Sequence, residues 1–172
     1  TLANEICGRF KPIADSEGKA LDITIPSEAY SYRVDHDALE KILNNILSNA
    51  VKYAVSSINL KLEEEPDYFS IIISNDGEKI ASSEQDNVFK MFYQVKGSKN
   101  GTGIGLPLAR MLAERHGGSL TIDPESDMTT FVVKIPGERS LAQETGKESS
   151  GSTPTPISIE ETSILVIDDN ED

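Results

Sequence analysis

The stretch that decides the fold reads DALEKILNNILSNAVKYA and spans residues 37–54. Its apolar side chains recur three or four positions apart, which is the spacing of one face of an α-helix. Asp35 or Asp37 can cap the start of this helix, because a carboxylate accepts hydrogen bonds from the free amides of the first turn. The sequence therefore predicts one long amphipathic helix. Its apolar positions are Leu39, Ile42, Leu43, Ile46, Leu47, Ala50, Val51 and Ala54.

A polar stripe borders that apolar face. Asn45, Asn49 and Lys52 are spaced i, i+4 and i+7, so they project from the same side of the helix. Asparagine is a mediocre helix former, and its recurrence in mid-helix calls for a reason. One interpretation is a solvated outer face, and the other is the lining of a pocket. In a pocket, an asparagine carbonyl suits Mg²⁺ and the Lys52 ammonium suits a phosphate.

Apolar segments on both sides of this helix indicate β-strands. Residues 21–25 and 58–62 alternate between apolar and polar side chains, as in half-buried strands. Residues 68–73 form an almost continuous apolar run, which predicts a strand buried on both faces. Two more strands are expected near residues 120–122 and 131–135. Strands adjacent in sequence favour hairpins, so we expect an α/β fold (an α+β sandwich) with a mixed, largely antiparallel sheet covered by helices on one face.

The composition changes sharply after residue 137. Residues 138–161 are rich in Ser, Thr, Gly, Pro and Glu and lack apolar periodicity, as expected for a flexible linker. The sequence therefore predicts a compact domain of residues 1–137, a linker of residues 138–161, and a terminal segment of residues 162–172.

Charge and cysteine content narrow the function classes. The formal charge of −13 argues against general nucleic-acid binding, because such a surface repels a phosphate backbone. More than half of this charge lies in residues 138–172, which hold nine acidic and two basic side chains. The single cysteine, Cys7, excludes an intrachain disulfide and is compatible with a reducing cytosol. No apolar run has the length of a membrane span, so we expect a cytoplasmic domain, with any membrane anchor elsewhere in the parent chain.

Residues 101–105 read GTGIG and lead directly into a second helical pattern that ends at Gly117 and Gly118. Glycines allow a ligand to approach the backbone closely, and a helix N-terminus favours an anion. The loop is therefore a candidate phosphate site, although an ordinary loop and N-cap would have the same pattern. Leu106 and Pro107 follow the third glycine, and a polar segment precedes the loop, so neither a Walker loop nor a dinucleotide fingerprint fits.

Four segments together resemble the N, G1, F and G2 boxes of sensor histidine kinases, in that order along the chain. They are NNILSNAVKYA (44–54), SNDGEKI (74–80), VFKMFYQV (88–95) and GTGIGLPLAR (101–110). The resemblance covers essentially all of residues 1–136. It implies an ATP-binding catalytic domain of the Bergerat type, shared with gyrase, a heat-shock chaperone and mismatch-repair ATPases, with ATP and Mg²⁺ as its cofactors.

The resemblance also implies roles for individual residues. Asn49 matches the asparagine that holds Mg²⁺ at the phosphates, and Asn45 matches the second N-box asparagine one turn earlier. Lys52 and Tyr53 match a basic–aromatic pair that approaches phosphate and adenine. In the ATPase relatives, a glutamate that activates water stands at the position of Asn45, and an amide cannot act as a general base. This favours transfer of the γ-phosphate to another protein over hydrolysis, with Asn45 and Lys52 as catalytic residues.

The G1 box departs from the family pattern Asp-x-Gly-x-Gly, in which the aspartate accepts a hydrogen bond from the adenine amino group. The matching positions are Asn75, Gly77 and Lys79. Asn75 offers a carbonyl oxygen without the charge, and a neutral hydrogen bond contributes about 0.5–1.5 kcal/mol against about 1.5–3 kcal/mol for one to a charged group. Asp76 compensates only if its side chain turns toward the nucleotide. We therefore expect weakened nucleotide binding.

The segment from residue 80 to residue 100 resembles the mobile lid of the family. We expect Phe89, Met91 and Phe92 to anchor this lid on the core, and backbone amides of the G2-box glycines to follow the triphosphate. Together with Asn49 as the metal ligand, the predicted nucleotide-binding residues are Asn45, Asn49, Lys52, Tyr53, Asn75, Gly77, Lys79, Ile80, Phe89, Phe92, Gly101, Thr102, Gly103, Ile104, Gly105 and Leu106.

The two histidines, His36 and His116, do not lie in a stretch like the family's phosphoacceptor box. We therefore expect the phosphoacceptor histidine and its dimerising helices upstream of residue 1, and residues 1–172 to be monomeric and unable to phosphorylate themselves. The segment TSILVIDDNED (162–172) resembles the first strand of a response-regulator receiver domain, whose paired acids bind Mg²⁺. That resemblance implies a hybrid kinase, and a bare acidic tail is the alternative.

Three functions remain open at this point. The leading hypothesis is the catalytic domain of a hybrid histidine kinase, with ATP, an upstream phosphoacceptor domain and a receiver domain as partners. Asn75 and Lys79 leave open a degenerate module that keeps the fold but only binds another protein. An ATPase of the same fold is the third hypothesis, disfavoured because Asn45 replaces the glutamate.

Overall fold

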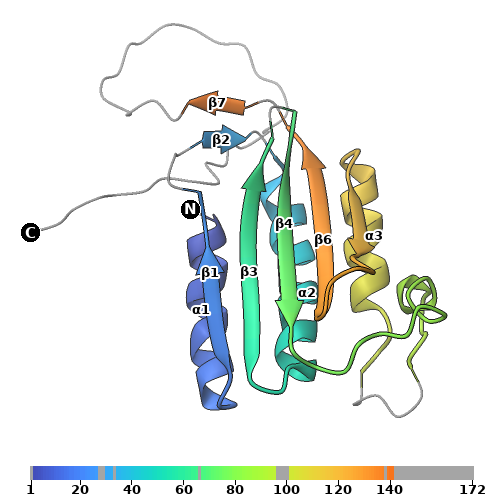
Figure 1. Cartoon of the computed structure of the whole chain (residues 1–172). Helices are drawn as coiled ribbons and strands as arrows, with labels where there is room; N and C mark the ends of the chain where they lie inside the picture. The colour runs from blue at the N-terminus through green and yellow to red at the C-terminus, as the bar shows by residue number, and fades with distance from the viewer. Residues whose placement is uncertain are drawn as a thin grey trace, which may run out of the picture.

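The fold is described from a computed structural model of the chain (Figure 1), which describes residues 2–26, 30–32, 34–65, 67–95, 101–137 and 139–141. The terminal segment of residues 162–172 and most of the predicted linker lie outside these residues. Within the described residues, no helix is both long and apolar enough to cross a membrane.

Helices cover one face of a five-stranded sheet (Figure 1), so the structure has two layers. The strand order is β1-β3-β4-β6-β5, and a separate two-stranded sheet joins β2 to β7. The elements are α1 (Leu2–Ser16), β1 (Ala20–Thr24), β2 (Tyr30–Tyr32), α2 (His36–Tyr53), β3 (Ser57–Glu64), β4 (Tyr68–Asn75), the 3-10 helix η1 (Asn87–Phe89), α3 (Gly105–Arg115), β5 (Ser119–Ile122), β6 (Thr129–Pro136) and β7 (Arg139–Leu141).

The sheet is mixed, which confirms the predicted fold class. β1 runs parallel to β3, while β3–β4, β4–β6 and β5–β6 are antiparallel. The parallel pair arises because α1 and β1 precede α2, and the chain crosses through α2 before it enters β3. The two hairpins expected from the spacing of apolar segments are β3–β4 and β5–β6.

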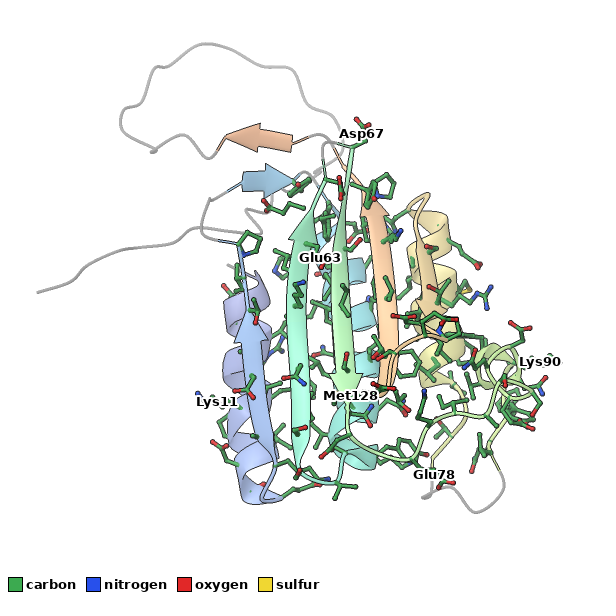
Figure 2. All side chains as sticks on the ribbon, in the orientation of Figure 1. Lys11, Glu63, Asp67, Glu78, Lys90 and Met128 are labelled. Atoms are coloured by element: carbon green, nitrogen blue, oxygen red, sulfur yellow. The ribbon has the colours of Figure 1, made fainter. Side chains whose placement is uncertain are left out.

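The core lies between α2 and the sheet. Alternate side chains of β3, β4 and β6 point toward the helices, as the period of a strand requires. On β4, Phe69, Ile71 and Ile73 are buried on that side, whereas Ile72 on the opposite face is only half-buried. The prediction that β4 is buried on both faces was therefore wrong for Ile72. The continuous apolar run of β4 reflects the central position of this strand in the sheet. Ile72 remains half-buried because no described helix covers the open face of the sheet, where Met128 lies (Figure 2).

Two parts of the fold were not predicted. α1 contains Gly8 and Pro12, and residues that disfavour helix interiors obscured its apolar spacing. The strands β2 and β7 are three residues long, too short for a periodic pattern. β7 lies inside the predicted linker, so strand pairing extends past residue 137. Tyr32 of β2 is buried, and its ring centroid lies 4.9 Å from that of Phe69.

The N-terminus of α2 is tied to the C-terminus of α3. Asp35 is the N-cap of α2, and its carboxylate accepts a hydrogen bond from the Ala38 amide at 3.0 Å. The same carboxylate lies 3.4 Å from Nε2 of His116, the C-cap of α3. The hydrogen bond from the Ala38 amide, aided by His116, lowers the pKa of Asp35. One carboxylate therefore orients two helices.

We expect Asp35→Ala to reduce the free energy of unfolding at pH 7 by about 1 kcal/mol, the usual cost of losing an N-cap. Because the folded-state pKa is lowered, this contribution is present above the unfolded-state pKa and is lost as the pH falls through the folded-state value. Urea denaturation of both chains between pH 7 and pH 3 measures the difference. Asp37→Ala is the matched control, because Asp37 is exposed and is not the N-cap. An equal loss for both variants would contradict the assignment.

Candidate functional site

The predicted site residues gather at one end of the sheet. The C-terminal end of α2, the end of β4 and the N-terminus of α3 lie together at the lower edge of Figure 1. Glu78 and Lys90, labelled in Figure 2, mark the connection that leaves β4 and returns to α3 at the same end. Two segments that are distant in sequence therefore pack along α2 here: α3 begins beside Asn45, and the turn after β4 packs on Tyr53.

The side chain of Asn45 faces the start of α3. Its Nδ2 donates a hydrogen bond to the carbonyl of Lys41 at 2.8 Å, which orients the amide. A Cβ atom on Gly105 would lie 3.0 Å from Oδ1 of Asn45, so the absence of a side chain there allows the close approach. Asn45 and Asn49 are both half-buried. Asn45 therefore lies against the start of α3 and is not part of a fully solvated face.

The N-terminus of α3 has no side-chain cap. Ile104 occupies the N-cap position without a side-chain hydrogen bond, and Gly105 is the first helical residue. Pro107 lies in the first turn, where a missing N–H costs little. The positive end of this helix dipole therefore lies beside the Asn45 carbonyl oxygen, an arrangement suited to a phosphate with its cation.

Lys52 and Tyr53 lie on the last turn of α2. The Lys52 ammonium lies 4.8 Å from the centroid of the Tyr53 ring, and both side chains are half-buried. A Cβ atom on Gly77 would lie only 2.2 Å from the Tyr53 carbonyl oxygen. The turn after β4 therefore packs backbone against backbone on the end of α2, and only glycine fits at position 77.

Asn75 is buried, with 1% of its surface exposed, and its amide is hydrogen-bonded within the protein at both ends. Its Oδ1 accepts from the Gly77 amide at 3.1 Å, and its Nδ2 donates to the Thr129 carbonyl at 3.5 Å. Lys79, at the position where the family has a second glycine, is exposed. Asn75 therefore shapes the turn, and its carbonyl oxygen is already engaged by an amide.

Asp76 turns away from Asn75 and binds the segment that follows α2. Its carboxylate accepts hydrogen bonds from the amides of Val55 and Ser56 and from the Ser56 hydroxyl. These contacts, the Ser56 hydroxyl first, hold the pKa of Asp76 well below its usual value. The charge of Asp76 therefore does not replace the one missing at position 75. The direction of this side chain could not be predicted from the sequence, because its partners lie 20 and 21 residues away in the chain.

The predicted lid is anchored by fewer residues than expected. Phe89 is half-buried against the core, with the Arg110 guanidinium 4.7 Å from its ring centroid, and Ile80 also packs on the core. Met91 and Phe92 are 54% and 74% exposed, so the prediction that they anchor the lid was wrong. Their apolar character alone suggested burial, but the backbone path directs them outward.

Phe92 and Gly103 are in backbone contact where the predicted lid meets the glycine loop. Phe92 has a φ of 64°, and its amide donates to the Gly103 carbonyl at 2.8 Å. Gly103 has a φ of 67°, and a Cβ there would lie 2.7 Å from the Phe92 backbone. Gly101 and Thr102 are exposed, whereas Ile104 and Leu106 are half-buried. The glycine loop therefore packs through the backbone of Gly103 on the segment predicted to be the lid.

The mixed sheet covered by helices on one face agrees with the Bergerat fold expected from the sequence. Residues 34–139 match the family described as histidine kinase-, DNA gyrase B-, and HSP90-like ATPase, and the chain belongs to this family.

The curated relatives with similar sequences include sensor kinases. Sensor histidine kinase YcbM of Bacillus subtilis is 29% identical over 143 residues, covering 77% of this chain and 46% of that protein. Sensor protein IrlS of Burkholderia pseudomallei is 30% identical, covering 78% of this chain and 30% of that protein. Sensor protein EvgS of Escherichia coli K12 is 31% identical, covering 99% of this chain and 15% of that protein. The chain thus spans less than half the length of these relatives.

Solved structures show the same fold. Full-length ShkA in complex with AMPPNP superposes with a TM-score of 0.74 and 22% identity, covering 82% of this chain and 30% of that chain. The mycobacterial sensor histidine kinase MprB gives a TM-score of 0.69 and 22% identity, covering 81% of this chain and 94% of that chain. At this level of identity, the similarity establishes the Bergerat fold alone.

We expect Gly77→Ala to reduce the free energy of unfolding by about 1–3 kcal/mol, because the new methyl group meets the Tyr53 carbonyl and the backbone must shift. Gly8→Ala is the matched control. Gly8 lies within α1 with no atom inside 4 Å of its Cβ position, so this variant should gain about 0.5–1 kcal/mol. Urea denaturation measures both, and a Gly77 variant as stable as the native chain would contradict the close approach.

Proposed function

We propose that this domain binds Mg²⁺-ATP and donates the γ-phosphate to a histidine on a phosphoacceptor domain outside residues 1–172, in two-component signalling. The observation that carries the proposal is the approach of the Asn45 amide oxygen to Gly105 at the uncapped N-terminus of α3. The family match and the sensor kinases among its relatives support the same activity.

The donor set on α2 fits a magnesium ion. Asn49 would hold Mg²⁺ through its amide oxygen, and Asn45 would face the phosphates from one turn earlier. Mg²⁺, when bound, neutralises phosphate charge. Lys52 would approach the phosphates as a point charge, and amides of residues 101–106 would follow the triphosphate.

An amide at position 45 favours phosphate transfer over hydrolysis. Asn45 cannot accept a proton from water at neutral pH, so nothing at this position activates a hydrolytic nucleophile. Phosphoryl transfer needs mainly positioning and neutralisation of charge, which Asn45 and Lys52 can supply.

The base would bind beside the end of α2 and the turn after β4, which are themselves in contact. Tyr53, Asn75, Gly77, Lys79 and Ile80 are the proposed contacts there, with Phe89 and Phe92 from the lid. Because the Asn75 oxygen already accepts from Gly77 and carries no charge, we expect weaker binding of adenine than a carboxylate would give.

The parent protein is proposed to be a hybrid kinase acting in the cytoplasm. The similarity to EvgS extends over 99% of the chain and so reaches the segment that resembles a receiver strand, residues 162–172. A relative from Dictyostelium discoideum, 34% identical over 143 residues, is described as a hybrid signal transduction histidine kinase.

The first test is calorimetric titration of Mg²⁺-ATP into the chain. We expect Mg²⁺-dependent binding, and we expect Asn49→Ala to weaken it by at least tenfold because the metal ligand is lost. Ser48→Ala is the matched control, since Ser48 is an exposed neighbour on α2. No heat at millimolar nucleotide and several temperatures, with the chain folded, would favour a module that only binds another protein.

The second test separates transfer from hydrolysis. With radiolabelled ATP and a phosphoacceptor domain supplied in trans, we expect acid-labile label on that domain and none on residues 1–172. Lys52→Met should slow this transfer by about tenfold or more, because a phosphate contact is lost. Rapid release of phosphate without the acceptor would instead indicate an ATPase.

A further inference from the structure

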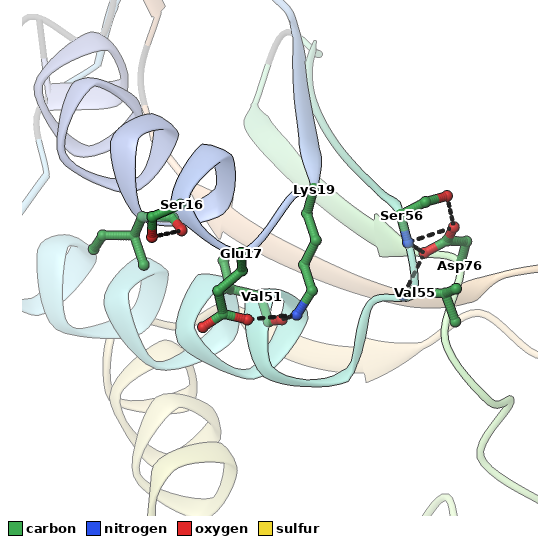
Figure 3. A network of polar contacts seen from close by, with 8 residues as sticks. Ser16, Glu17, Lys19, Val51, Val55, Ser56 and Asp76 are labelled. Atoms are coloured by element: carbon green, nitrogen blue, oxygen red, sulfur yellow. Dashed lines mark hydrogen bonds and ion pairs between the residues drawn. The ribbon is translucent and has the colours of Figure 1, made fainter.

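A polar network holds the C-terminal end of α2 from two sides (Figure 3). On one side, Lys19 follows α1 and has only 8% of its surface exposed. Its ammonium donates to the Val51 carbonyl at 2.5 Å and to Oε2 of Glu17 at 2.6 Å. A cation is favoured at this place, because the last carbonyls of a helix carry its negative dipole end.

On the other side, Asp76 holds the residues that follow α2. Its carboxylate accepts from the Val55 amide at 2.8 Å, the Ser56 amide at 3.0 Å and the Ser56 hydroxyl at 2.6 Å. Its own amide donates to the Ser57 carbonyl at 3.2 Å. The carboxylate thus fixes the chain immediately after the helix, with several hydrogen bonds to one charged group.

The two sides of the network are joined through backbone. The Ala20 amide donates to the Ser56 carbonyl at 2.8 Å, which ties the segment held by Asp76 to the strand that follows Lys19. Gly77, next to Asp76, packs against the Tyr53 carbonyl so closely that no Cβ fits. A shift of residues 55–56 or of the turn at Gly77 would therefore displace the last turn of α2.

Lys52 and Tyr53 lie on the last turn of α2, between the contact made by Lys19 and the contacts made by Asp76. The Lys19 contact is to the residue before Lys52, and the Asp76 contacts begin two residues after Tyr53. Neither Lys19 nor Asp76 belongs to the set proposed above to contact nucleotide. Besides Glu17 and the Ser56 hydroxyl, the partners of these two charges are backbone groups of α2 and of the residues that follow it.

We propose that Asp76 and Lys19 are positioning residues, which fix Lys52 and Tyr53 in the geometry that binds nucleotide. The inference rests on the proposed function, since it concerns the affinity of that site. The carboxylate stands at position 76 of this turn rather than at position 75. According to the inference, it positions α2 and does not contact the base.

The experiment compares the dissociation constant of Mg²⁺-ATP among variants that circular dichroism shows to be folded at the temperature of titration. We expect Asp76→Ala to raise this constant by about tenfold and Lys19→Met by about threefold, because small displacements of binding groups are costly. Asp76→Asn, which keeps one acceptor oxygen for the Val55 and Ser56 amides, should restore most of the affinity. Hydrogen exchange of these two amides should accelerate in Asp76→Ala and less in Asp76→Asn.

Asp35→Ala is the control for stability alone. It also removes a carboxylate that accepts a backbone hydrogen bond on α2, but at the opposite end of the helix. It should unfold more easily while its dissociation constant stays within about twofold of the native value. A purely structural role for Asp76 predicts the same behaviour for Asp76→Ala and Asp35→Ala.

The outcomes separate this inference from the proposed function. Native affinity in Asp76→Ala and Lys19→Met, with binding by the unaltered chain, overturns the inference alone. If Asp76→Ala does not fold, the dissociation constants of Ser56→Ala and Lys19→Met test the inference in its place. Values within twofold of the native constant for both variants overturn the inference. Absence of binding by the unaltered chain overturns the proposed function and the inference with it.

Discussion

The packing of the apolar face of α2 against the sheet is the constraint on which the rest of the structure depends. Side chains from Leu39 to Val51 are buried there, and the helical period then leaves no choice about where the polar stripe lies. Asn45, Asn49 and Lys52 border the buried face, and the start of α3 lies against Asn45 at this border. The packing of this one helix face thus contributes to the stability of the domain and also determines the direction of the polar side chains of α2.

The close packing of glycine residues against neighbouring segments is the second feature of the proposed site. Gly77 meets the Tyr53 carbonyl, Gly103 meets the Phe92 backbone, and Gly105 meets the Asn45 amide. Each contact joins two segments that are distant in sequence, and each leaves no room for an additional side chain without a shift. Gly77, Gly103 and Gly105 therefore have a structural role in bringing these segments together.

The turn after β4 distributes its polar groups in an unusual way relative to the family pattern. The neutral Asn75 is buried and holds the turn, while the charged Asp76 binds the exit of α2. Lys19, from the other side, binds the last turn of the same helix. The charges of Asp76 and Lys19 therefore bind backbone groups at this end of α2, with the Ser56 hydroxyl and the Glu17 carboxylate as further partners.

The sequence by itself determined α2, the two hairpins, the mixed sheet and the identity of the polar stripe, because periodicity and four ordered motifs are local properties. It did not predict α1, whose Gly8 and Pro12 disguise the helix, or the short strands β2 and β7. Only the tertiary structure decided that Met91 and Phe92 face outward and that Asp76 points to Ser56. The direction of a side chain in a turn depends on partners distant in sequence, and local pattern carries no information about them.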